Sequence, residues 1–169
     1  MLVIRLAAPS NIPQIMQLIN EIVPVMIAAG NMQWDSTYPN VEVFKNDIAL
    51  SQLWVADIEG RIAGVLAITT DNEPEYAEAG LDINEPAIVT HRLAVSLLYR
   101  GRGLAAALLN KADEVALSRN ISVLRIDTSA DNQVTQKLFP KAGYVFAGEI
   151  DLPVSPGQRF YCYEKRLSL

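Results

Sequence analysis

The short segment Arg100-Gly101-Arg102-Gly103 has the composition of an anion-binding loop. Glycine lets the backbone turn tightly and approach a ligand closely. The helix expected from Leu104 onward presents free backbone N–H groups and the positive end of its dipole. The two arginines add cationic donors. Residue types and order together predict a site for a phosphate group.

One phosphate-bearing ligand that this loop could hold is a dinucleotide. The string Gly101-x-Gly103-x-x-Ala106 fits the loose dinucleotide fingerprint, and Asp127 lies at the end of the next expected strand, where it could hold a ribose. However, residues 96–100 separate the preceding strand from the glycines, and Asp127 lies farther on than the usual ~20 residues. An antiparallel hairpin upstream is also foreign to a doubly wound half. A nicotinamide-dependent reductase is therefore only our third alternative.

The elements that must position this loop alternate along the chain. Apolar residues recur at helical spacing from Ile12 to Met26, and Pro24 is expected to kink or split that helix. Further helices are expected at 41–50, 104–119 and 132–142, and strands at 2–6, 53–58, 62–69, 87–95, 123–128, 144–150 and 160–166. This order predicts a mixed α/β fold, with an antiparallel meander followed by a β-α-β unit.

Residues 71–86 form an acidic segment between two expected strands. Its carboxylates are Glu73, Glu75, Glu78, Asp82 and Glu85. Charge runs are usually solvated, so we expect a solvated linker. The alternative is a negative field that attracts a cationic substrate.

Length and composition limit the remaining possibilities. The 169 residues are expected to form a single domain spanning 1–169, with 50% apolar and 20% charged residues. A net charge of −5 argues against a nucleic-acid partner. No apolar run approaches the ~20 residues of a membrane span, so no membrane partner is expected. The lone Cys162 suits a reducing, cytoplasmic location, and one histidine without a ligand cluster implies no metal.

The string Arg100-x-x-Gly103-x-Ala105 matches the Q/R-x-x-G-x-G/A acyl-CoA signature of the GNAT superfamily of N-acetyltransferases. The neighbouring strings resemble that family as well: His91-Arg92-Leu93-Ala94-Val95, Ile126-Asp127-Thr128, Asn132 and Lys141-Ala142-Gly143-Tyr144. The resemblance covers about residues 87–166 by motif and the first half by element order only. It is nearest to uncharacterised bacterial members with a Gln-Trp loop and a Phe-Tyr-Cys strand. It implies a mixed, mostly antiparallel central sheet with splayed strands, flanked by helices.

The resemblance implies acetyl-CoA as the cosubstrate. Backbone N–H groups of the glycine loop would hold the pyrophosphate, and the pantetheine arm would pair with Leu93 and Val95 like an extra strand. A backbone N–H near Val95 would polarise the thioester carbonyl. The implied cofactor-binding residues are Leu93, Ala94, Val95, Arg100, Gly101, Arg102, Gly103, Leu104, Ala105, Asn132 and Phe139.

Acetyl transfer to an amine needs a neutral amine, so a base should take its proton. His91, the chain's one histidine, is the candidate general base. Strand alternation would place it on the same face as Leu93, near the expected thioester. The family's usual tyrosine acid falls at Phe139, which cannot donate a proton. Tyr161 on the last strand is a candidate substitute.

Substrate contacts are expected from the loop after the first helix and from the last strand. The candidates are Gln33, Trp34, Tyr38 and Phe160. The implied function is an acetyl-CoA-dependent N-acetyltransferase that acts on a small molecule or an N-terminal amine by direct attack in a ternary complex. The alternative is a non-catalytic acyl-CoA-binding or sensing module, which the departure at Phe139 favours. Homodimers are common in the family, so the resemblance makes a second copy of the chain a candidate partner. The sequence does not identify the acceptor amine or the length of the acyl group.

Overall fold

The computed structural model describes residues 1–153 and 155–168. Its seven-stranded sheet has the order β1-β2-β3-β4-β5-β7-β6. The strands are β1 (Leu2–Leu6), β2 (Leu53–Ile58), β3 (Arg61–Thr69), β4 (Ile88–Val95), β5 (Val123–Ser129), β6 (Val145–Ile150) and β7 (Phe160–Arg166). The α-helices are α1 (Ile12–Ala28), α2 (Val41–Ala49), α3 (Leu104–Ser118) and α4 (Gln133–Lys141). Short 3-10 turns are η1 (Pro9–Asn11), η2 (Pro74–Ala79) and η3 (Leu97–Tyr99).

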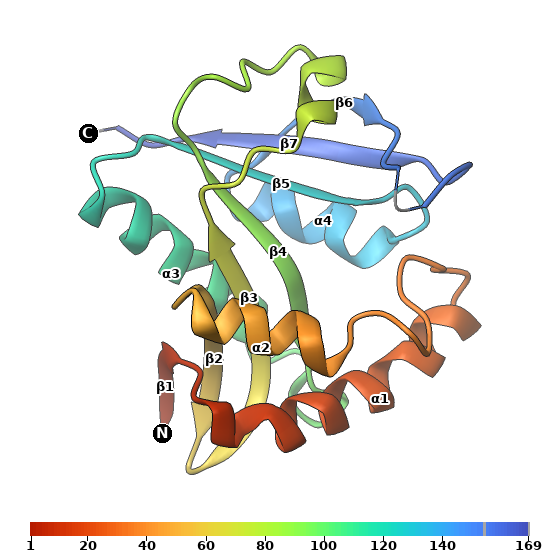
Figure 1. The fold of residues 1–169 in the computed structure, drawn as a ribbon, viewed down its shortest axis with the longest axis vertical. Coiled ribbons are helices and arrows are strands. Elements are labelled where there is room, and N and C mark those ends of the chain that lie inside the picture. Colours follow the sequence, from red (N-terminus) through yellow and green to blue (C-terminus); the bar gives the residue numbers. More distant parts are fainter. Residues whose placement is uncertain (154, 169) are drawn as a thin grey trace.

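The sheet combines the two parts expected from the sequence. Strands β1 to β4 form an antiparallel meander, and β5, β7 and β6 pair antiparallel at the other end. Only β4 and β5 pair in parallel among the described strands, and α3 connects them (Figure 1). The mixed, mostly antiparallel α/β fold is thus confirmed.

Strands β4 and β5 separate halfway along their length. Their ladder ends at the pair Thr90↔Ile126, although β4 continues to Val95 and β5 to Ser129. Beyond that pair, β4 remains bonded to β3 on its other side, and β5 remains bonded to β7. The result is a gap in the middle of the sheet, as the expected splay requires.

A β-bulge in β4 changes which side chains share a face. Arg92 has φ of 58°, and the β3–β4 register shifts so that Val65 pairs with Ala94 but Ala67 pairs with His91. The extra residue rotates the strand between His91 and Leu93. The expectation that these two side chains share a face is therefore wrong.

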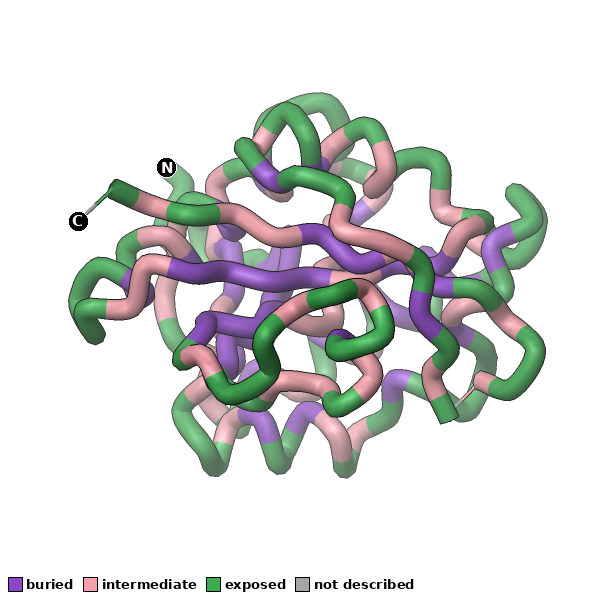
Figure 2. The backbone as a smooth tube through the Cα atoms, turned by 90° about the horizontal axis from the view of Figure 1, so that it is seen from above, coloured by how far each residue is buried: buried purple, intermediate pink, exposed green. Residues whose placement is uncertain are grey.

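The two faces of the sheet bury separate apolar clusters. Helices α1 and α2 cover one face through residues such as Ile15 and Phe44, which pack on Val55 and Val65 (Figure 1). Helix α3 and Phe139 of α4 cover the other face. Buried positions accordingly follow the central strands and the inner sides of the helices (Figure 2).

Of the two outcomes expected at Pro24, a kink or a split, the split does not occur, because helix α1 runs through Pro24 without a break. A proline inside a helix frees the carbonyl four residues before it. Here that carbonyl belongs to Asn20, and both Asn20 and Pro24 are exposed. Water can therefore satisfy the freed carbonyl, and the buried face of the helix is untouched.

The acidic segment 71–86 is not a solvated linker, contrary to expectation. Its residue Tyr76 is fully buried. The guanidinium of Arg125, 0% exposed, donates to Asn72 Oδ1 and to the Asp82 carbonyl, both at 2.9 Å.

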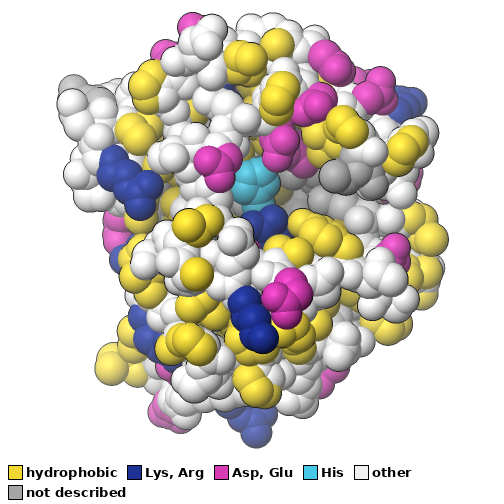
Figure 3. All heavy atoms as spheres, viewed as in Figure 1, with side chains coloured by type: hydrophobic (Ala, Val, Ile, Leu, Met, Phe, Trp, Pro, Cys, Tyr) yellow, Lys and Arg dark blue, Asp and Glu magenta, His cyan; other side chains and the backbone are white. Residues whose placement is uncertain are grey.

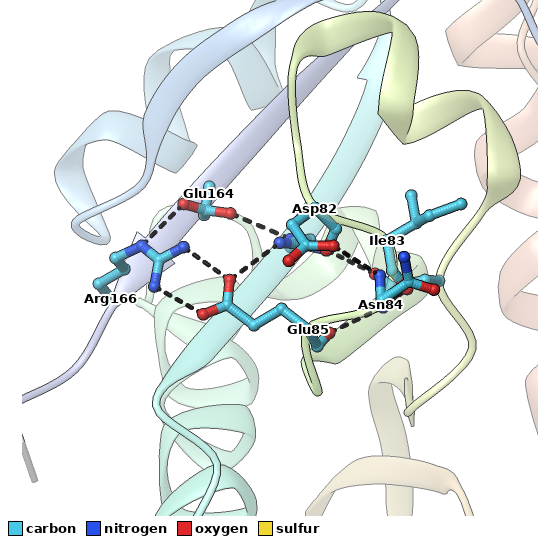
Figure 4. Close-up of polar contacts among 8 residues, drawn as sticks. Asp82, Ile83, Asn84, Glu85, Glu164 and Arg166 are labelled. Carbon is cyan, nitrogen blue, oxygen red and sulfur yellow. Dashed lines mark hydrogen bonds and ion pairs between the residues drawn. The ribbon is translucent and has the colours of Figure 1, made fainter.

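Ion pairs extend this anchor across the sheet. Arg125 also pairs with Glu164 of β7 at 3.0 Å and with Glu85 of the segment at 3.4 Å. Glu85 and Glu164 are in turn both bonded to Arg166 (Figure 4). The segment is therefore fixed onto β5 and β7.

Replacement of Arg125 tests this anchor. We expect Arg125→Met to lower the free energy of unfolding by about 3–5 kcal/mol, because it leaves partly buried carboxylates and a carbonyl without their donor. Urea denaturation measures the change. The exposed Arg61 provides the control, and Arg61→Met should stay within about 0.5 kcal/mol of the wild type. Equal losses in the two variants would contradict the anchoring role.

Candidate active site

The glycine-rich loop has the geometry of an anion cradle. Gly101 and Gly103 both have φ of 77°, the left-handed region that favours glycine, and Gly103 is the N-cap of α3. A Cβ built on either glycine would meet nothing within 4 Å. The first-turn N–H groups of α3 thus adjoin open space in which a phosphate could lie.

This loop forms one end of a cavity of about 750 Å³, which occupies the gap between β4 and β5. Its other end is lined by α1, by the 31–34 loop and by side chains at the point where the strands part. The volume is typical of small-molecule and cofactor sites. Thirteen of the expected site residues line it: Gln33, Trp34, His91, Leu93, Ala94, Val95, Arg100, Gly101, Gly103, Leu104, Ala105, Asn132 and Phe139.

Four expected site residues do not line the cavity. The Arg102 guanidinium lies over the Tyr99 ring, 5.3 Å from its centroid. Phe160 is buried in the cluster beneath the acidic segment. The two remaining residues, Tyr38 and Tyr161, each contact an arginine.

The hydroxyls of Tyr38 and Tyr161 each accept a hydrogen bond from an arginine, and Arg92, the partner of Tyr38, itself lines the cavity. The Tyr38 hydroxyl accepts a hydrogen bond from Arg92 at 3.3 Å. The Tyr161 hydroxyl accepts one from Arg159 at 3.4 Å, and its ring packs edge-on against Phe146. This geometry does not support Tyr161 as the proton donor to a leaving thiolate.

Two loops around the cavity are fixed by side-chain amides. Asn132 accepts a hydrogen bond from the Thr135 N–H at 3.2 Å and thereby caps α4, as expected. Gln33 accepts one from the Ser129 N–H at 3.2 Å, which ties the 31–34 loop to the end of β5. Phe139 is 1% exposed and packs against the ring of Tyr163, so it contributes only an apolar wall.

His91 lies at the point where the strands part, in an environment that weakens it as a base. Burial, reinforced by the nearby Arg92 guanidinium, lowers the pKa of His91 to about 4, with Asp47 opposing. Arg92 is held in place by Asp47, which is 1% exposed, through two hydrogen bonds of 2.7 and 2.6 Å. At neutral pH the imidazole is therefore uncharged and a poor proton acceptor.

Asp127 is a functional candidate that the sequence analysis considered only as a ribose ligand. It lines the same cavity, and its Oδ2 accepts a hydrogen bond from the Tyr76 hydroxyl at 2.6 Å. Burial raises the pKa of Asp127 to about 6, and the Tyr76 bond opposes that rise. Extension of the parallel β4–β5 register from Thr90↔Ile126 could have placed it beside His91.

The acidic segment lies close to this end of the cavity. Burial, together with the carboxylates of Asp127, Glu75 and Asp71, raises the pKa of Glu73. Figure 3 shows the chain's one histidine at the bottom of a hollow, with acidic side chains beside it. The electrostatic character of this end is negative, whereas the loop end carries arginines.

Among residues 1–153 and 155–168, no group of three or more His, Cys, Asp or Glu side chains is arranged to hold a metal ion. No helix of that same portion has the length and apolarity needed to cross a membrane.

The opposite pKa shifts of Asp127 and His91 predict opposite effects on stability. The folded protein keeps a proton on Asp127 up to about pH 6, so this group lowers stability as pH rises from 4 to 6. His91 resists protonation down to about pH 4, so it lowers stability as pH falls from 6.5 to 4.

We therefore expect Asp127→Asn to be more stable than the wild type above pH 6, by at most about 2–3 kcal/mol, with the gain vanishing near pH 4. His91→Gln should instead be more stable than the wild type below pH 6, and this difference in stability should vanish above pH 7. Urea denaturation between pH 4 and 8 measures both. Parallel curves for the two variants and the wild type would contradict these shifts.

Comparisons with known proteins agree with this fold. A sequence profile described as "Acetyltransferase (GNAT) family" matches residues 15–144. A crystal structure of a GNAT-family acetyltransferase from Streptococcus agalactiae superposes with a TM-score of 0.84 at 30% identity, covering 99% of this chain and 96% of that one. A structure of yncA from Salmonella typhimurium with its cofactor acetyl-CoA has a TM-score of 0.67 at 13% identity, which shows a shared fold only; it covers 100% of this chain and 95% of that one.

Curated relatives match over shorter stretches. Human N-acetylaspartate synthetase is 29% identical over 115 residues, 68% of this chain and 34% of that protein. L-2,4-diaminobutyric acid acetyltransferase from Streptomyces coelicolor is 45% identical over 53 residues, 31% of each chain. The chain spans little more than a third of the length of the synthetases that it matches. With the family profile covering residues 15–144, the chain belongs to the GNAT family of acetyltransferases.

Proposed function

We propose that this protein transfers the acetyl group of acetyl-CoA to a primary amine by direct attack in a ternary complex. The observation that carries the proposal is the continuous cavity between β4 and β5. It joins an anion cradle at one end to titratable side chains at the other. Such a cavity can hold a phosphate-bearing donor and an acceptor at the same time.

The residues around the cavity fit coenzyme A. The open space at Gly101 and Gly103 and the N-terminus of α3 suit a pyrophosphate. Arg100 lines the same end and adds a cation. Beyond Thr90, the facing edges of β4 and β5 share no ladder, so the backbone near Leu93 and Val95 can pair with the amide groups of a pantetheine arm.

When bound, acetyl-CoA supplies the acetyl group as an activated thioester. The protein orients the reactants and excludes water, and a backbone N–H near Val95 polarises the carbonyl. An alkylamine is mostly protonated at neutral pH, so a protein group must also accept its proton. His91 is the group expected from the sequence. Because its pKa is lowered to about 4, a neighbouring group is a stronger candidate for the proton acceptor.

The acceptor is an amine of a small molecule or of a protein N-terminus. Two relatives carry names that specify an amino acid, aspartate and 2,4-diaminobutyric acid. Amino acids are therefore the first acceptors to test. The rival function is an acyl-CoA sensor without turnover, which the replacement of the expected tyrosine by buried Phe139 still favours.

An acceptor screen separates enzyme from sensor. Acetyl-CoA is offered with L-aspartate, L-2,4-diaminobutyrate, cyclohexylamine, spermidine and a short peptide, and thiol release is followed with a chromogenic disulfide. We expect saturable thiol release that requires both acetyl-CoA and one of these amines. CoA binding without release across the screen would favour the sensor. A rise in melting temperature with NAD but not with CoA would contradict the cosubstrate itself.

A valine at Gly103 tests the cradle. The substitution would fill the open space beside the α3 N-terminus, and we expect it to weaken CoA binding at least about a hundredfold, measured by calorimetry. Its positive φ also strains valine, so the control must carry the same strain.

Gly60 provides that control, because it has φ of 87° and lies in the β2–β3 turn, outside the lining of the cavity, where an added Cβ would meet nothing within 4 Å. Gly60→Val should lower the melting temperature about as much as Gly103→Val while CoA affinity stays unchanged. An unchanged affinity in Gly103→Val would remove the phosphate role of the loop.

A further inference from the structure

We propose that Asp127, held by the Tyr76 hydroxyl, binds the ammonium group of the acceptor and accepts its proton, and that the acceptor therefore enters as a cationic alkylamine. This inference rests on the proposed acetyl transfer and assigns a residue and a substrate class to it.

The position of Asp127 suits contact with the acceptor. The last parallel pair is Thr90↔Ile126, so the next residue on each strand, His91 and Asp127, flanks the point where the gap opens. Both line the cavity. On its other side, β5 is paired with β7, where Asp127 faces Cys162. Asp127 is therefore fixed by the sheet at the boundary between the cofactor gap and the acceptor end.

The Asp127 carboxylate is incompletely satisfied by the protein. Its Oδ2 accepts the 2.6 Å bond from Tyr76, and within residues 1–153 and 155–168 no donor reaches Oδ1 within hydrogen-bond distance. A buried carboxylate is costly unless it is paired and fully hydrogen-bonded. The open oxygen therefore has room for a donor that comes from the ligand.

Among the residues that the structure describes, none of the charged groups near Asp127 neutralises it. The titratable groups that act on it or are acted on by it are Tyr76 and Glu73 of the acidic segment and Cys162 of β7. From β4, the neighbouring His91 is uncharged at neutral pH. Arg92 could be a counterion, but Asp47 binds it through two hydrogen bonds.

The surrounding field favours a cation for the same reason. Glu73 is near enough to Asp127 for that carboxylate to help raise its pKa, and Glu75 and Asp71 add further negative charge beside Glu73. Like charges in a partly buried hollow raise the local concentration of cations. An ammonium group supplies both the missing positive charge and the missing donor.

The acidic segment is built to keep Tyr76 in place. By strand alternation Arg125 and Asp127 lie on one face of β5. Arg125 holds the segment through Asn72, the Asp82 carbonyl and Glu85. The bonds that fix Glu85 are visible in Figure 4. The segment that carries Tyr76 is therefore anchored to β5 at Arg125, only two residues from the Asp127 that Tyr76 contacts.

The acceptor ammonium, R–NH3⁺, gives one proton to the Asp127 carboxylate and becomes R–NH2. The nitrogen lone pair forms the N–C bond to the acetyl carbon as the C–S bond breaks. The second proton leaves the nitrogen as the amide forms and ends on the CoA sulfur. Asp127 then releases its proton to water, so the products are R–NH–acetyl, CoA–SH and H⁺.

Asp127 is a better candidate base than His91 because of its pKa as well as its position. Efficient proton transfer favours a group whose pKa lies near the working pH. The pKa of Asp127 is raised to about 6, whereas that of His91 is lowered to about 4. Single substitutions of Asp127 and of His91 distinguish the contributions of these two groups to the rate.

The decisive test compares Asp127→Asn with His91→Gln on the best alkylamine of the acceptor screen. We expect Asp127→Asn to lower kcat/KM at pH 7 by about 10²–10⁴-fold, with CoA affinity and folding retained. The defect should shrink at high pH, where the amine deprotonates in solution. His91→Gln should lose less than tenfold. The exposed Glu78 of the same segment provides the charge control, and Glu78→Gln should stay within twofold.

Tyr76→Phe adds a second measurement, the pH dependence of kcat/KM, which would not change if Tyr76 and Asp127 had only a structural role. The Tyr76 bond lowers the pKa of Asp127, so its removal should raise that pKa. The acid limb of the kcat/KM profile, expected near pH 6 in the wild type, should move to higher pH in Tyr76→Phe and disappear in Asp127→Asn. An acid limb that stays in place in Tyr76→Phe would count against the proposed contact.

The cation preference is tested by competition. Cyclohexylamine and aniline have similar rings, but only the former is protonated at pH 7. Cyclohexylamine should compete more strongly with the best acceptor in the wild type, and this preference should vanish in Asp127→Asn. Equal or reversed competition, or an Asp127→Asn variant as active as the wild type, overturns the inference while acetyl transfer stands. A wild type without turnover on any amine refutes the proposed function instead.

Discussion

The parting of β4 and β5 after Thr90↔Ile126 is the constraint on which the rest of the molecule depends. Opening a sheet leaves backbone groups without partners, which is costly unless something else bonds them. Each strand keeps its outer neighbour through the open region, since β4 remains paired with β3 as far as Val95 and β5 with β7 as far as Ser129. The gap is therefore held open by the two halves of the sheet rather than by flexible loops. A ligand with amide groups can complete the sheet, and the α3 N-terminus lies at its end for the phosphates.

The bulge at Arg92 decides which side chains face the two ends of this gap. Its extra residue places His91 on the face of Ala67 and leaves Leu93 on the side of α3. The bulged Arg92 is then tied to Asp47 of α2, so its positive charge is neutralised locally. One irregular residue thus connects sheet register, helix docking and the electrostatics of the acceptor end. Bulges beside functional sites commonly re-aim side chains in this way.

Local sequence signals were enough to predict the elements and the tight turns of the glycine-rich loop. Alternating apolar strands, the Asn132 cap and the paired glycines Gly101 and Gly103 each act within a few residues, so spacing reveals them. Long-range pairings were not predictable in this way. The bulge depends on register with β3, and the order of the acidic segment depends on Arg125, whose partners lie 39 to 53 residues away. Tyr161 and Phe160 were expected at the site on motif alone, but neighbours on β6 and the acidic segment enclose them.

Arg125 and Asp127 differ in how completely the fold satisfies their charges. Both lie on the same face of β5, two residues apart, and both contact segment 71–86. Arg125 is fully buried, and all three of its guanidinium nitrogens have acceptors. Asp127 has one donor, the Tyr76 hydroxyl, and lines the cavity. A fold able to satisfy one buried charge so completely could satisfy its neighbour. The difference is that Asp127 lies where the strands have parted, so the missing partner is one that a ligand can supply.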